Sequence, residues 1–301
     1  MDQKKSKIIL RVIGAIVVLL AIGYWMLMAS LPGISTIENY RLESTVVDLA
    51  NFDWSKEIIA PVRKYVPLGR ISPELRTAVL ISEDDTFFGH SGININELKK
   101  AFQENLEKKK YARGASTITM QVAKNAFLTK QKTLIRKIKE ILIAKRIEKI
   151  WSKQKIFEYY LNIAEWGHNI YGAEAAARYY FDKPASQLDL AEAALLAGML
   201  PNPIILNPFK NWDRVKSRQQ RVLKLLRNAS MITDQQYQDL MTQRIYLRGT
   251  APMLEEQFPD AEISIFEELL KDPSIPKQFK DKADSTGILF IPEEEEDDSL
   301  D

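Results

Sequence analysis

The chain has 301 residues, of which 46% are apolar and 27% are charged, with a formal net charge of +2, so it can form one large globular domain or two modest ones. It contains no cysteine, which excludes disulfide bonds, thiolate nucleophiles and zinc-thiolate sites. The two histidines, His90 and His168, permit a Ser-His-Asp triad by number but exclude metal sites that need several imidazoles.

The N-terminal region contains an apolar run, Val12–Ala29, long enough to cross a bilayer as a helix. Basic residues precede this run, and the positive-inside tendency places them in the cytoplasm: Lys4, Lys5, Lys7 and Arg11. A cleaved signal peptide is the alternative, but Leu27-Met28-Ala29 is a poor cleavage site. We therefore expect a cytoplasmic segment at 1–11 and an uncleaved anchor at 12–29, with the remaining chain on the opposite side of the membrane from the cytoplasm.

Helical periodicity dominates the chain after the anchor. Residues 30–64 lack sustained periodicity and are interpreted as a stem or short extended element. From Ser72, which can cap a helix with Pro73 in its first turn, apolar residues recur at helical spacing to about residue 245. Further helices are predicted at Ile95–Lys108, Ser116–Phe127, Thr133–Trp151, Lys153–Asn162, Gly172–Tyr180, Leu188–Leu200 and Asn211–Asn228. The predicted fold is mostly α, with a main domain at 65–245. Residues 246–301 are expected to form an extension whose acidic end is disordered.

The charge is distributed unevenly along the chain. Between Lys99 and Lys155 there are 17 Lys and Arg residues against 4 acids, whereas residues 293–301 are almost all acidic. A solvated helix surface explains most basic runs, and nucleic acid is the usual alternative. The predicted anchor argues against nucleic acid and favours anionic lipid headgroups or a lipid-linked phosphate.

The first candidate motif follows the helix that begins near Ser72. Glu83 and Asp84 end this helix, and Phe87, Phe88 and His90 come next. Desolvation beside aromatic side chains can raise the pKa of a carboxyl group and prepare it as a general base. A solvated helix end with a structural histidine explains the same residues, and the motif alone favours that interpretation.

The second motif covers residues 113–125. Gly114 permits close backbone approach, and Ser116 can cap a helix whose free N–H groups attract phosphate. Gln121 and Lys124 would project from nearby turns, adding a neutral donor and a positive charge. An ordinary capped amphipathic helix also explains this motif, and for the motif by itself it is the better explanation.

The third motif lies on the next predicted helix. Arg136 and Glu140 are one turn apart, with Lys137 also beside Glu140. A helical salt bridge accounts for the spacing. The functional interpretation requires cations that face a pyrophosphate leaving group, with Glu140 orienting them. The spacing does not decide between the two.

Taken in order, these motifs resemble the peptidoglycan glycosyltransferase family, whose domain also opens the bifunctional penicillin-binding proteins. The matching residues are Glu83, Asp84, Phe87, His90, Gly92, Gly114, Ser116 to Thr119, Gln121, Lys124, Asn125, Arg136, Lys137, Glu140, Tyr160 to Asn162, Gly167 and Gly172. The resemblance covers roughly Val66–Pro208, with departures at Ala115 and Met120, where the family often has Gly and Gln. No Ser-x-x-Lys transpeptidase motif follows these blocks, so we expect the monofunctional type.

The resemblance implies a lysozyme-like lobe and a small hydrophobic lobe that dips into the bacterial inner membrane, with residues 93–112 as part of the latter. It implies that lipid II is polymerised on the extracytoplasmic face into β-1,4 glycan, with release of undecaprenyl pyrophosphate. Glu83 would be the base and Glu140 would position the pyrophosphate or its cations. The implied substrate-binding residues are Asp84, His90, Ser116, Gln121, Lys124, Lys132, Arg136 and Lys137.

The implied partners are lipid II, the growing lipid-linked strand, the membrane and other cell wall synthesis proteins, and no nucleic acid. A Mg²⁺ or Mn²⁺ ion could assist at the pyrophosphate, but the sequence has no dedicated ligand cluster. Two alternatives remain open: a lysozyme-type enzyme that cleaves finished glycan, and a membrane-tethered scaffold without activity. The basic stretch argues against the first because cleavage releases no pyrophosphate, and the intact Glu83 and Glu140 motifs argue against the second.

Overall fold

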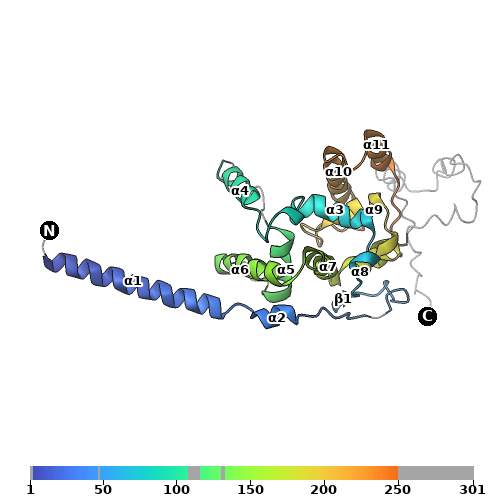
Figure 1. Ribbon diagram of the computed structural model, residues 1–301. Coiled ribbons are helices and arrows are strands. Elements are labelled where there is room, and N and C mark those ends of the chain that lie inside the picture. The colour runs from blue at the N-terminus through green and yellow to red at the C-terminus, as the bar shows by residue number, and fades with distance from the viewer. Residues whose placement is uncertain (1–2, 47, 108–115, 130–132, 250–301) are drawn as a thin grey trace, which may run out of the picture. The chain divides into compact units, whose positions relative to one another are not determined.

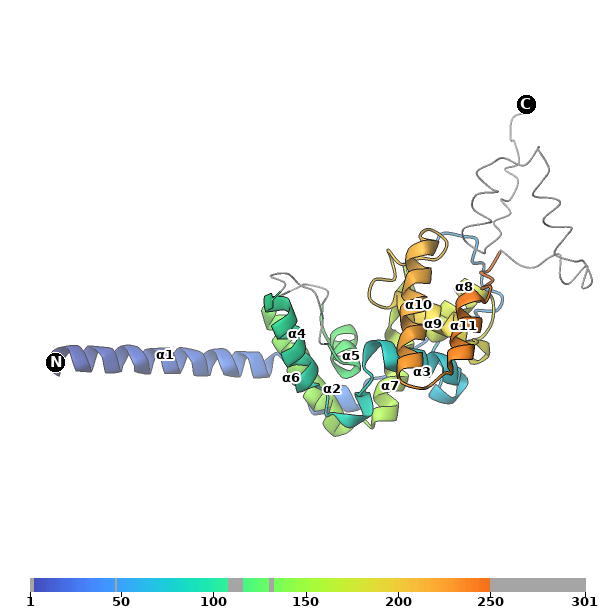
Figure 2. The same ribbon diagram turned by 90° about the horizontal axis from the view of Figure 1, so that it is seen from above.

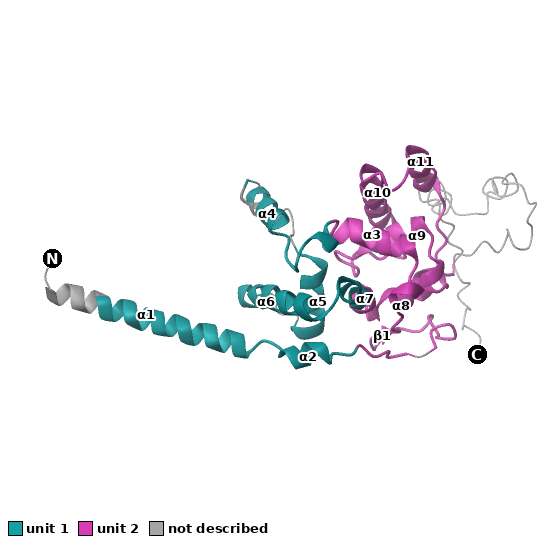
Figure 3. Cartoon of the chain, in the orientation of Figure 1, with its two compact units in different colours: residues 1–41, 86–160 teal, residues 42–85, 161–301 magenta. Residues whose placement is uncertain are grey.

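The computed structural model describes residues 3–46, 48–107, 116–129 and 133–249 (Figure 1). Helices dominate these residues, together with one three-stranded sheet, which confirms the predicted mostly α fold class. The chain divides into two compact units (Figure 3). Unit 1 comprises residues 1–41 and 86–160, and unit 2 comprises residues 42–85 and 161–301.

Unit 1 begins with the long apolar helix α1 (Gln3–Ala29). A candidate membrane span is found at Leu10–Glu38; its apolar 18-residue window has a mean hydropathy of 2.4, and none of that window is buried inside the protein. Large apolar side chains such as Leu20 and Trp25 are about 70% exposed (68% and 71%). A bilayer would cover this surface, so the helix has the properties predicted for the anchor.

Helix α2 (Ile34–Glu38) lies in the predicted stem, where no helix was expected. Its five residues are too few to show a periodic pattern, and tertiary contacts hold it. Ile37 is fully buried, and α2 packs against α6 (Leu134–Ile150). Arg146 of α6 donates a hydrogen bond of 2.8 Å to the carbonyl oxygen of Pro32, which fixes the chain just before α2.

The centre of unit 1 is the packing of α5 (Ile118–Phe127) against α6, which lie beside one another in Figures 1 and 2. Fully buried apolar side chains form this contact: Ile118, Val122, Ala123, Ile143, Ala144 and Ile147. Helices α4 (Ile95–Glu107) and α7 (Lys153–Ile163), the latter ending in unit 2, follow the predicted ranges closely. The expected cap of α5 was wrong: the cap lies one residue later, where the side chain of Thr117, not Ser116, accepts the N–H of Met120 at 3.2 Å.

Unit 2 is built on α3 (Pro73–Glu83), α9 (Leu190–Met199) and α10 (Trp212–Asn228). These three helices pack on one another, and most of α9 is buried. A side chain at Gly198 would come within 3.0 Å of the backbone of Arg218, so glycine permits α9 and α10 to approach closely. The cap predicted for α3 is confirmed, because Ser72 Oγ accepts the N–H of Leu75 at 3.1 Å.

A small sheet in unit 2 was not predicted. It contains β1 (Val62–Arg63), β2 (Glu165–Gly167) and β3 (Ile170–Tyr171) in the order β1-β3-β2. Strand β3 pairs in parallel with β1, where Val62 is opposite Ile170, and antiparallel with β2. Strands of two or three residues are too short for alternation to appear in the sequence.

Asn162 of the Tyr-Leu-Asn motif and the later Gly172 have structural roles around this sheet. The buried side chain of Asn162 accepts from the N–H of Val66 at 2.8 Å and donates to its carbonyl oxygen at 2.9 Å. Gly172 has a φ of +85°, and a side chain there would lie 2.8 Å from the carbonyl oxygen of Asn162. Glycine is therefore required at position 172.

The remaining helices of unit 2 are α8 (Ala173–Phe181) and α11 (Asp234–Thr242). Three short 3-10 turns complete the described elements: η1 (Leu68–Arg70) and η3 (Ala185–Gln187) in unit 2 and η2 (Phe87–Gly89) in unit 1. No individual helix was predicted at α11, which is short and buries none of its own residues. A capping box between Thr233 and Gln236 stabilises its first turn.

Candidate active site

The proposed base lies at the end of α3 in unit 2. Glu83 is the last residue of this helix, and Asp84 is its C-cap, with a backbone N–H that donates to the carbonyl oxygen of Leu80 at 2.9 Å. Glu83 is half-buried and Asp84 is buried.

Phe87 and His90 lie in unit 1, on the segment that follows these carboxylates in the chain. Phe87 is fully buried and contacts the ring of Phe157, with 5.9 Å between the ring centroids. The ring of His90 meets Phe87 edge-on at 6.2 Å. Phe87 therefore belongs to the core of unit 1, and His90 is held half-buried beside it.

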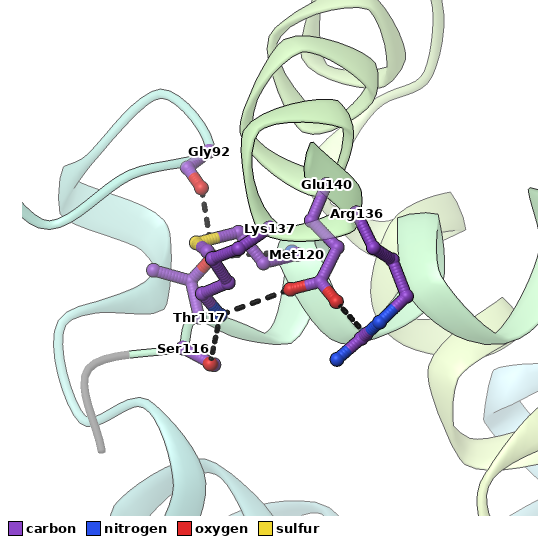
Figure 4. A network of polar contacts seen from close by, with 7 residues as sticks. All are labelled: Gly92, Ser116, Thr117, Met120, Arg136, Lys137 and Glu140. Atoms are coloured by element: carbon purple, nitrogen blue, oxygen red, sulfur yellow. Dashed lines mark hydrogen bonds and ion pairs between the residues drawn. The ribbon is translucent and has the colours of Figure 1, made fainter. Parts of the chain in front are cut away.

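Four of the predicted residues meet in unit 1, in a group that we call the Glu140 network: Ser116, Arg136, Lys137 and Glu140 (Figure 4). One oxygen of Glu140 accepts from Arg136, and the other accepts from Lys137 Nζ at 2.9 Å. Lys137 Nζ also donates to Ser116 Oγ at 2.6 Å. The network joins the start of α6 to the residue just before the cap of α5.

The Glu140 network carries an excess of positive charge. The side chain of Glu140 is only 3% exposed, and a carboxylate buried to this extent requires its partners. Arg136 and Lys137 supply two positive charges against its single negative charge, and Lys137 remains 40% exposed. The carboxylate holds both cations in place, and the excess positive charge can stabilise an anion such as a pyrophosphate.

Helix α5 carries two further predicted residues. Gln121 accepts a hydrogen bond of 3.4 Å from the hydroxyl of Tyr160, and Lys124 lies in the last turn of the helix. Both are half-buried. Lys132 and Gly114 lie outside the described residues. In unit 1, the fold thus brings Ser116, Arg136, Lys137 and Glu140 into one network and adds Gln121 and Lys124 on α5.

Thr117 has a role that motif spacing does not reveal. Its hydroxyl donates to the carbonyl oxygen of Gly92 at 2.7 Å while accepting the N–H of Met120 (Figure 4). This side chain therefore ties the segment that carries His90 to the first turn of α5. The family motif includes Thr117, but no spacing rule predicts a contact between residues 25 positions apart.

The described residues do not form a protein-held metal site. Nowhere in this part of the chain do three or more His, Asp or Glu side chains gather in an arrangement that could hold an ion. The one carboxylate of the Glu140 network is already engaged by two cations, which is unfavourable for a divalent metal. The Mg²⁺ or Mn²⁺ ion considered from the sequence, at the pyrophosphate, stays a prediction.

A cavity of about 380 Å³ lies in unit 2, between α10 and the end of α11. Its lining includes Trp212, Lys216 and Arg244 but no predicted site residue. Burial lowers the pKa of Lys216 from its usual value. None of the residues that line the cavity belongs to the Glu140 network.

The transglycosylase family model matches residues 54–227, more than half of the chain. The chain belongs to the transglycosylase family. The matched range contains every predicted site residue from Glu83 to Glu140. The mostly α fold and the ordered motifs therefore belong to one family domain, as the resemblance implied.

Several curated relatives in this family carry the name "Biosynthetic peptidoglycan transglycosylase". The relative from Dechloromonas aromatica is 44% identical over 157 residues, which cover 52% of this chain and 65% of that protein. The relative from Aromatoleum aromaticum is 50% identical over 140 residues, covering 46% and 61%. The chain thus spans slightly less than two thirds of the length of these relatives.

Penicillin-binding protein 4 of Bacillus subtilis is a longer relative, 35% identical over 198 residues that cover 66% of this chain and 31% of that protein. Among solved structures, the crystal structure of penicillin-binding protein 1A from Haemophilus influenzae is matched with a TM-score of 0.37 and 20% identity. That match covers 62% of this chain and 18% of the other.

Proposed function

We propose that this transglycosylase is a peptidoglycan glycosyltransferase that polymerises lipid II into β-1,4-linked glycan and releases undecaprenyl pyrophosphate. The names of the relatives support the substrate class. The observation that carries the proposal is the Glu140 network, in which a buried carboxylate holds two cations and leaves one positive charge in excess. Such a group of cations can stabilise the negative charge that develops on a pyrophosphate leaving group.

In the proposed reaction, Glu83 removes the proton from the 4-hydroxyl of the acceptor GlcNAc. The hydroxyl oxygen then forms a bond to the anomeric carbon of the donor MurNAc. The bond from that carbon to the pyrophosphate oxygen breaks, and its electron pair leaves with undecaprenyl pyrophosphate. Attack from the opposite face converts the α-linked donor into a β-1,4 linkage.

The cations would act on the leaving group. Arg136 and Lys137 would stabilise the negative charge that develops on the pyrophosphate, with Lys124 and Lys132 contributing further positive charge. Glu140 keeps the first two cations in position, since its carboxylate is paired with both. Asp84 and His90 would organise the surroundings of the base, and Ser116 and Gln121 would supply neutral hydrogen-bonding groups.

The membrane would supply the substrate. The apolar span at Leu10–Glu38 supports an anchor, and the basic residues before it favour a catalytic domain on the extracytoplasmic face of the bacterial inner membrane. Exposed apolar side chains in unit 1 support a membrane-facing lobe that includes α4 and the start of α6: Ile95, Leu98, Leu134, Ile135 and Ile138. Lipid II would then reach the Glu140 network without leaving the membrane surface.

The test is to offer the full-length enzyme two substrates in separate reactions: labelled lipid II, and purified finished peptidoglycan. The proposal predicts long glycan from lipid II and no soluble fragments from peptidoglycan. Fragments released from peptidoglycan without conversion of lipid II would replace the proposal with a glycan-cleaving enzyme. Inactivity on both substrates would favour the non-catalytic scaffold.

A further inference from the structure

Glu148 is a buried acidic residue that the mechanism above does not use. It lies near the end of α6, two turns beyond Glu140, and its side chain is 8% exposed. Its oxygen accepts a hydrogen bond of 2.5 Å from Thr119 of α5 and forms an ion pair of 2.7 Å with Lys153 of α7. One carboxylate therefore connects three helices of unit 1.

The segment that carries His90 lies against the aliphatic part of the same side chain. We call residues 86–92 the His90 loop. At its end, Gly92 has a φ of +83°, and a side chain there would lie 3.0 Å from Glu148 Cγ and 3.2 Å from the carbonyl oxygen of Ala144. Only glycine permits this approach of the loop to α6.

Lys153 contacts the other end of the His90 loop. Its Nζ lies 4.2 Å from the centroid of the Phe87 ring, a cation–π contact, and its side chain is only 18% exposed. Glu148 holds this ammonium in place through their ion pair. The pair thus touches the loop at Phe87 through Lys153 and at Gly92 through Glu148.

We infer that Glu148 and Lys153 are positioning residues that hold the His90 loop in register with the first turn of α5. This inference rests on the proposed function. Thr117 donates to the carbonyl oxygen of Gly92, and its neighbour Ser116 accepts from Lys137. An unfastened loop would shift His90 relative to the Glu140 network, and a displacement of about 1 Å can lower a catalytic rate about 100-fold.

The test compares Glu148→Gln with Glu174→Gln, a matched control in unit 2. The side chain of Glu174 is also a buried carboxylate, 9% exposed. It forms an ion pair of 3.5 Å with Arg178 and accepts a hydrogen bond of 2.8 Å from the backbone N–H of Ala185. Both variants lose a buried ion pair, and both should melt at lower temperature than the wild type. Only Glu148→Gln should lower kcat per folded enzyme on lipid II, by about 10- to 100-fold with little change in KM. Hydrogen exchange in residues 86–92 should accelerate in the same variant alone.

A double variant, Glu148→Gln with Lys153→Met, separates positioning from folding. Removing the uncompensated ammonium should restore much of the melting temperature. The double variant should keep a low kcat because the ion pair that holds the His90 loop is absent. Wild-type kcat and unchanged exchange at residues 86–92 in this stable variant would overturn the inference while leaving the proposed function intact. If the wild type itself fails to convert lipid II, the proposed function fails and the positioning role fails with it.

Discussion

Replacing Glu140 with Gln tests whether the Glu140 network acts in catalysis or only in folding. The carboxylate is 3% exposed and meets Lys137 Nζ at 2.9 Å. At this separation the gross attraction is about 6 kcal/mol for an effective dielectric constant of about 20. Desolvation of both groups offsets much of that attraction, and screening reduces it further because Lys137 is 40% exposed.

We therefore expect the free energy of unfolding to fall by about 3 kcal/mol, since the neutral amide leaves Arg136 and Lys137 without their counter-charge. The melting temperature should fall by about 6–12 °C for a domain of this size. The catalytic rate should fall independently of stability, because cations that Glu140 no longer holds in place cannot stabilise the pyrophosphate as it departs. We expect a fall in kcat of about 100- to 1,000-fold.

The assay measures glycan formation from labelled lipid II, normalised to folded enzyme, beside melting curves for the same preparations. Glu174→Gln serves again as the control, because it removes a buried carboxylate from an ion pair in unit 2. It should lower the melting temperature and keep kcat. A Glu140→Gln enzyme with wild-type kcat and a lowered melting temperature would refute the reasoning and leave the network a structural salt bridge.

Three further predictions concern separate parts of the molecule. Lys124→Ala should lower kcat/KM for lipid II, measured per folded enzyme, about 100-fold; a kcat/KM equal to that of the wild type would show that Lys124 does not act on the leaving group. Gly172→Ala should lower the free energy of unfolding by about 2 kcal/mol or more in urea titrations, because φ is +85° and the new methyl meets Asn162; an unchanged midpoint would contradict this close approach. Burial raises the pKa of Glu192 above its usual value of 4.5 and outweighs the opposing effect of Lys183. Between 4.5 and the raised pKa the folded state binds more protons than the unfolded state, so the stability of the wild type should fall as the pH rises through this window. Glu192→Gln should lack that fall and gain stability relative to the wild type over this window; parallel pH profiles in urea titrations would contradict the assignment.

Periodicity and capping chemistry were sufficient to predict the long helices. Ser72 and Pro73 mark the start of α3 as the structure has it, because a cap and a first-turn proline act locally. The same reasoning misplaced the cap of α5 by one residue, since Ser116 and Thr117 are both suitable caps. The structure assigns the capping bond to Thr117 and the contact with Lys137 to Ser116.

Short elements and long-range contacts could not be predicted in this way. Helix α2 is held by the burial of Ile37, and each strand of the sheet is held by its neighbours. Within the Glu140 network, the spacing of Arg136 and Glu140 predicts their ion pair, but the bond from Lys137 to Ser116 joins residues 21 positions apart. The role of Glu148 could not be predicted from local spacing because its partners lie on other helices, α5 and α7.

The most direct test of the account is the rate at which full-length Glu83→Gln polymerises labelled lipid II, measured beside the wild type at equal folded concentration. The amide retains the size of the carboxylate but cannot accept the proton of the acceptor hydroxyl. The account predicts a loss of about 100- to 10,000-fold. Glycan made by Glu83→Gln at the wild-type rate would contradict the assignment of Glu83 as the base.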